Sequence, residues 1–294
     1  FQNYLRLNAP ALAGRGIAVW GPQRTRAGLF DGLQPGGLAA VPPRLQRRAA
    51  GRVQLHMARL RGQDTGLLLV SDAAMLGPLR DNLRSLTLYA AAGERMARFA
   101  LAFGGAPDVV ISIRNLAGYW ASAFARGVQQ GHPVPPAGAF ARLAAADRSW
   151  RDVITDVACA MPEARVRVAA HETFCARPDV VLEALTGIEA PEAHARQHLC
   201  PAPHLEALRA AAPAGAAAST QHSFTRYSAS ASMRAKLAQQ AMLRPLRVCS
   251  TSPAAARKRR WWVQVEAAMP SACCTSPTVR PSGPARTRRR SAWR

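Results

Sequence analysis

The chain of 294 residues is poor in lysine, because only two of its 39 basic residues, Lys236 and Lys258, are lysines. It contains no uninterrupted apolar run of about 18 residues, which argues against a membrane-spanning helix. It has no G-x-x-x-x-G-K-[ST] motif, which disfavours an ordinary nucleotide hydrolase. Its six cysteines are too few and too irregularly spaced for a disulfide scaffold. No basic-then-apolar leader opens the chain. We therefore expect a reducing, cytoplasmic setting and no membrane partner.

The positive charge is concentrated near the carboxyl end. The formal net charge is +22, and residues 242–294, with 12 basic residues and the single acid Glu266, carry +11 of it. Arginine together with abundant alanine, glycine and proline is typical of GC-rich coding, which we favour as the source of the excess. Two interpretations of residues 242–294 stay open. They are a disordered or frame-shifted tail, which we favour, or an arm in which arginines beside tryptophans bind nucleic acid. Nucleic acid is expected as a partner only through this tail.

Strand patterns and helix patterns alternate over residues 1–241, which predicts an α/β domain with a mainly parallel sheet. Apolar or alternating runs predict strands over residues 16–21, 66–71, 108–113 and 165–170. Spacings of three and four between apolar residues predict helices over residues 83–103, 116–128, 139–146, 150–160 and 178–186. An opening helix is also expected, with a kink or restart at Pro10.

The most informative stretch surrounds Arg114. A buried strand runs directly into this arginine, a helix begins within a few residues, and Ser122 follows eight positions later. Ligands of open α/β sheets bind outside the carboxyl ends of the strands, which aims Arg114 at the ligand crevice. Ser122 then falls in the second turn of the next helix, where its hydroxyl can add a hydrogen bond to an anion held by Arg114. The alternative is a surface arginine at a strand end and a small helix-packing serine.

This segment resembles the 3′-phosphate-binding motif of the P-loop sulfotransferases, which use 3′-phosphoadenosine 5′-phosphosulfate as the sulfuryl donor. In that family a strand delivers an arginine and a serine follows eight residues later, the positions that Arg114 and Ser122 occupy. The resemblance extends over most of residues 1–240 and includes the segments 67–77 and 165–174. It implies a P-loop-like α/β fold and transfer of a sulfuryl group to a hydroxyl or amine. The acceptor is expected to be a small molecule or a carbohydrate.

The chain departs from the family pattern at its beginning. The family's first strand and its basic 5′-phosphosulfate loop would fall before Phe1. The resemblance therefore predicts a domain that is incomplete at its amino terminus, with one strand position of the sheet left unpaired. Because preorganised donors at the transferring group supply much of the catalytic effect, it also predicts an inactive chain. No catalytic residue is assigned.

Three weaker signals concern polar side chains. Asp72, just past a strand, is either a general base or an ordinary loop residue. His171 and Glu172 end another strand, where they either contact substrate or are bonded within the protein. His194, His198, Cys200 and His204 have spacings of metal ligands, but we favour surface histidines and predict no metal site.

Overall fold

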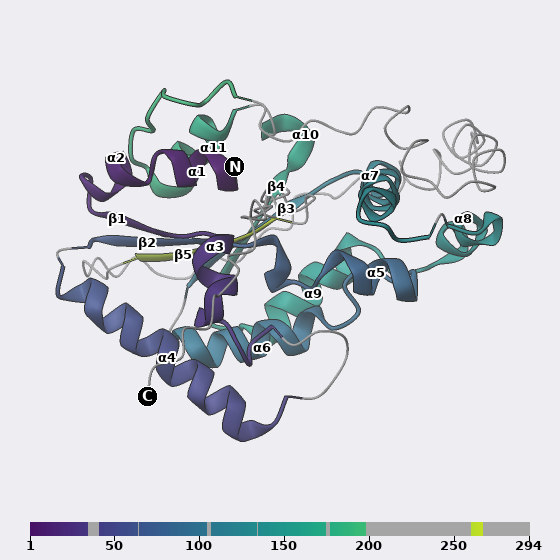
Figure 1. The fold of residues 1–294 in the computed structure, drawn as a ribbon, viewed down its shortest axis with the longest axis horizontal. Helices are drawn as coiled ribbons and strands as arrows, with labels where there is room; N and C mark the ends of the chain where they lie inside the picture. The colour runs from purple at the N-terminus through teal and green to yellow at the C-terminus, as the bar shows by residue number, and fades with distance from the viewer. Residues whose placement is uncertain are drawn as a thin grey trace, which may run out of the picture.

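The computed structural model describes residues 1–34, 41–63, 65–104, 107–133, 135–174, 177–197 and 260–266 (Figure 1). The amino-terminal half holds α1 (Gln2–Leu7), α2 (Ala9–Ala13), β1 (Ile17–Trp20), α3 (Pro22–Arg24), the π-helical turn η1 (Thr25–Leu29), α4 (Pro43–Arg61), β2 (Leu67–Ser71), the short 3-10 helix η2 (Ala73–Met75), α5 (Leu79–Ser85) and α6 (Ala92–Phe103). There follow β3 (Asp108–Ile113), α7 (Leu116–Gln129), α8 (Ala137–Ala145), α9 (Trp150–Ala160), β4 (Arg165–Ala170), α10 (His171–Phe174), α11 (Pro178–Thr186) and β5 (Arg260–Glu266).

The five strands form one parallel sheet in the order β1-β2-β5-β3-β4. The strand nearest the carboxyl end of the chain, β5, lies in the centre, where Val263 pairs with Val70 on one side and with Val109 on the other. The expectation of an unpaired strand position is therefore wrong, because β5 holds the place between β2 and β3. For the same reason, the expectation that residues 242–294 form a disordered tail is wrong for residues 260–266, which form β5. The rest of residues 242–294 lies outside the described residues, as does the proposed boundary at 241.

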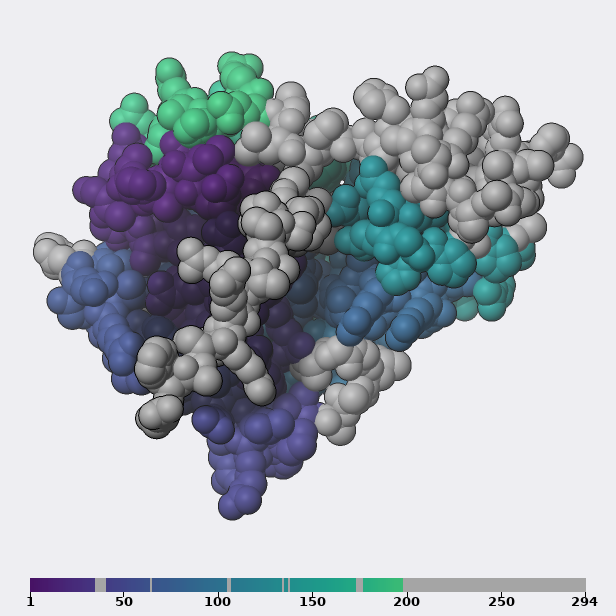
Figure 2. All heavy atoms as spheres, in the orientation of Figure 1, coloured from purple at the N-terminus to yellow at the C-terminus, as the bar shows by residue number. Residues whose placement is uncertain are grey.

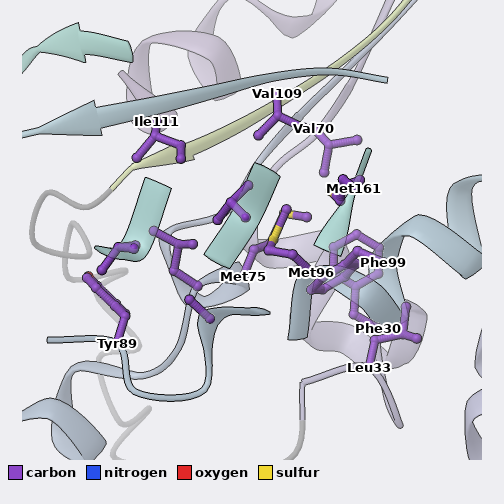
Figure 3. Packing of buried hydrophobic residues seen from close by; sticks show 14 of the residues in the cluster. Phe30, Leu33, Val70, Met75, Tyr89, Met96, Phe99, Val109, Ile111 and Met161 are labelled. Atoms are coloured by element: carbon purple, nitrogen blue, oxygen red, sulfur yellow. The ribbon is translucent and has the colours of Figure 1, made fainter. Parts of the chain in front are cut away.

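Helices cover both faces of the sheet (Figure 1). Successive residues of a strand point to opposite faces, and β2 is buried on both: Leu67 and Leu69 pack with α1, α2 and α11, whereas Leu68 and Val70 pack with α4, α6 and α9. The larger apolar cluster lies on the second of these faces and contains Phe30, as well as Met75, Met96 and Phe99 (Figure 3). This arrangement agrees with the predicted α/β class.

The four predicted strands are confirmed, with β3 and β4 at their predicted bounds and β1 and β2 within one residue of theirs. The predicted helix over residues 83–103 is wrong, because the chain breaks into α5 and α6. Leu86 and Tyr89 between them have φ of 51° and 43°. Two side chains hold this break: that of Asn82, within α5, accepts from the Tyr89 amide, and that of the distant Arg148 donates to the Leu88 and Tyr89 carbonyls. No glycine or proline signals it.

The sequence analysis did not identify α4. This helix buries a narrow stripe at every fourth residue, formed by Ala49, Val53 and Met57, and the remainder of its surface is rich in arginine. In the described part of the chain, no helix has the length and apolar character that a membrane crossing requires.

Candidate functional site

The candidate site lies at the edge of the sheet where the parallel strands end. Arg114 directly follows β3, and its Nη1 atom donates a hydrogen bond to Ser122 Oγ on α7 at 2.6 Å. The structure thus brings the two predicted residues together. The Arg114 side chain keeps a third of its surface exposed, so a ligand can approach it. The binding role itself stays a prediction.

Three neighbours fix the backbone at Arg114 and leave space for its side chain. The indole Nε1 of Trp150 donates to the Arg114 carbonyl at 2.6 Å. Asn115 caps α7 by accepting hydrogen bonds from the Ala117 and Gly118 amides. A Cβ atom at Gly118 would lie 3.3 Å from Arg114 Nε, which is tight, so glycine keeps this approach open. The arginine therefore sits in a held position rather than on a free loop.

A carboxylate shares the site. Glu172, at the start of α10, accepts a hydrogen bond from the Asn115 amide at 3.0 Å, and its Oε1 atom lies 3.9 Å from Arg114 Nε. The neighbouring His171 is partly buried, and burial, followed by the positive charge of Arg114, lowers its pKa below the usual value. Glu172 opposes that effect. The sequence left open whether Glu172 contacts substrate or is bonded within the protein, and the structure shows the second. The same contacts place Glu172 beside Arg114, the anion-binding candidate.

Asp72 is fully buried and has no free acceptor position. One of its oxygens accepts from Thr25 Oγ1 at 2.5 Å and from Arg26 Nε at 3.4 Å, and the other accepts from Arg26 Nη2 at 2.6 Å and from the Ala74 amide at 2.9 Å. The four donors occupy both oxygens of this buried side chain, so no position is left for an acceptor molecule to reach. Asp72 therefore connects the end of β2 with the turn after β1. This favours a structural role for Asp72 over the role of a general base.

Sequence reasoning missed Thr25, Arg26 and Trp150 as members of these networks. Thr25 and Arg26 follow the carboxyl end of β1, and Trp150 opens α9. Ligand-facing residues of parallel sheets gather after strand ends. That rule could have identified Thr25 and Arg26. No neighbouring residue in the sequence indicates that Trp150 contacts Arg114.

Metal binding finds no support in the described residues, where no group of three or more histidine, cysteine, aspartate or glutamate side chains could hold an ion. His198, Cys200 and His204 lie outside them. Comparisons of the chain with models of protein families, with curated proteins and with solved structures gave no match.

Proposed function

We propose that Arg114 and Ser122 bind the 3′-phosphate of an adenosine 3′-phosphate nucleotide, and that the chain is a sulfotransferase-like protein with 3′-phosphoadenosine 5′-phosphosulfate as donor. The observation that carries the proposal is the 2.6 Å contact between Arg114 Nη1 and Ser122 Oγ directly after β3, an internal strand of the sheet. A guanidinium binds a phosphate through two parallel hydrogen bonds, and an adjacent hydroxyl adds another. The parallel sheet with helices on both faces is the architecture that the resemblance implies.

The described residues fit the two ends of this donor unequally. Arg114, Ser122 and the space at Gly118 suit the 3′-phosphate. The basic turn after β1, residues 21–28, contains Gly21 and Gly28, but its Arg26 is paired with Asp72, and we assign no residue of this turn to the phosphosulfate. The transfer would move a sulfuryl group to an acceptor hydroxyl or amine and needs a base for the acceptor proton. Because Asp72 is saturated with donors, we assign no base.

Titration calorimetry with adenosine 3′,5′-bisphosphate tests the proposal. Replacing Arg114 by alanine should weaken binding by about 1.5–3 kcal/mol, the scale of a hydrogen bond to a charged group. Ser122→Ala should cost less, about 0.5–1.5 kcal/mol. Arg142→Ala, which removes an exposed arginine from α8, is the charge-matched control and should leave the affinity unchanged. Equal affinities of the Arg114 and Arg142 variants would contradict the assignment of the site.

A further inference from the structure

The outer side of α4 is a second basic surface, unconnected with Arg114. The helix contains six arginines and no acidic residue. Five of the arginines are exposed, and we call the four that precede Arg61, the last residue of the helix, the α4 arginine face: Arg44, Arg47, Arg48 and Arg59.

Helical geometry sets most of these side chains in a row. At 3.6 residues per turn, Arg44, Arg48 and Arg59 lie within about 60° of one another around the axis, and the rise of about 1.5 Å per residue makes the row about 22 Å long. The buried stripe of α4, with Val53 at its middle, lies on the opposite side. The amino-terminal part of α4 projects at the lower edge of the molecule (Figure 2). The α4 arginine face is therefore a convex ridge.

Among the residues that the structure describes, no carboxylate forms an ion pair with this ridge. The ion pairs among the described residues involve Arg26, Arg80, Arg95, Arg114, Arg148 and Arg177, and none includes a member of the α4 arginine face. The positive charge also affects the pKa of a neighbouring histidine, His56. Burial, followed by the positive charges of Arg24, Arg59 and Arg52, lowers the pKa of His56. Unpaired like charges in a row repel one another, and an anionic partner relieves that repulsion.

The shape of the surface selects among anionic partners. A membrane-surface helix inserts its apolar side into lipid, but the apolar side of α4 is buried in the core, and only Leu45 and Leu55 stand among the exposed arginines. A folded acidic protein needs a complementary surface of fixed shape. A nucleic acid duplex presents closely and regularly spaced phosphates on both sides of a groove about 12 Å wide, which admits a helix. We propose that the α4 arginine face binds the phosphate backbone of double-stranded nucleic acid, without sequence specificity.

The test uses the full chain and a fluorescent DNA duplex of about 20 base pairs, with anisotropy measured between about 50 and 200 mM salt. Two triple variants remove the same charge, one from α4 and one from exposed positions of α5, α8 and α9. The α4 variant carries Arg44→Gln, Arg48→Gln and Arg59→Gln. The control variant carries Arg84→Gln, Arg142→Gln and Arg151→Gln.

Each phosphate contact contributes about 0.9 to the slope of log affinity against log salt, so three lost contacts should reduce the slope by about 2.7. Over this fourfold salt range the wild type should then lose about 40-fold more of its affinity than the α4 variant does. The control variant should keep the wild-type slope. Equal slopes for the two variants would overturn the proposal, because they would show that net charge alone matters. Tighter α4-dependent binding of heparin, polyglutamate or phosphatidylserine vesicles than of the duplex would overturn the choice of partner.

Discussion

The central strand β5 should be indispensable to the sheet. It has five register pairs with β2 and five with β3, and in the described part of the chain it alone joins these two strands. The flanking strands are largely buried. A buried polar group left without its partner costs about 1–3 kcal/mol. If only half of the ten paired positions exposed such a group, losing β5 would cost about 5–15 kcal/mol. That range equals the whole stability of a typical domain.

A single proline measures this dependence without removing the strand. Val263→Pro takes away one backbone donor at the middle of β5 and should destabilise the protein by about 1–3 kcal/mol. For a folded unit of about 200 residues, this lowers the melting temperature by roughly 2–12 °C. Val263→Thr keeps the donor and a β-branched side chain, and is the control. Thermal and urea unfolding report the change, and hydrogen exchange of the β2 and β3 amides locates it.

The proline variant should speed exchange in β2 and β3 more than in α11, which lies outside the sheet. An unchanged melting temperature, together with unchanged protection of the β2 and β3 amides, would refute the reasoning. It would mean that the sheet holds together without β5.

Two further predictions concern the polar groups at the edge of the sheet. Because an anion beside Arg114 favours the protonated imidazole, adenosine 3′,5′-bisphosphate should raise the depressed pKa of His171. Binding should then tighten as the pH falls through the raised pKa of the complex toward the depressed pKa of the free protein. NMR titration of His171 with and without the nucleotide checks this, and an unmoved pKa would contradict it. Asp72→Asn should lower the free energy of unfolding by about 1–3 kcal/mol, because it weakens the hydrogen bonds to Thr25 and Arg26. Calorimetry should show an unchanged nucleotide affinity for this variant. A large loss of affinity with unchanged stability would assign Asp72 to the binding site instead.

The predicted strands and most predicted helices were recoverable from local patterns. β3 is rich in β-branched residues, and Ser149 caps the start of α9 through a capping box with Asp152. Such signals depend on neighbours in the sequence. The pairing of Arg114 with Ser122 was accessible for the same reason, since eight residues of strand end and helix start bring the two together.

The contacts that escaped prediction join distant parts of the chain. Trp150 reaches Arg114 across 36 positions, and Thr25 reaches Asp72 across 47. Arg148 holds the break between α5 and α6 from about 60 residues away. In each case the partner is set by how helices pack on the sheet, which a single sequence does not encode locally.

The strand β5 had a local signal that composition obscured. Trp261, Val263 and Val265 alternate with Trp262, Gln264 and Glu266, a period typical of strands. The surrounding arginines led us to treat residues 242–294 as one aperiodic tail, although charge informs about association and not about fold. This bears on the nucleic-acid arm that the sequence left open. Deleting the tail would remove the centre of the sheet as well as its charge, so a loss of binding would not identify an arm. Only substitution of arginines that flank residues 260–266, with β5 intact and the melting temperature unchanged, can separate the two.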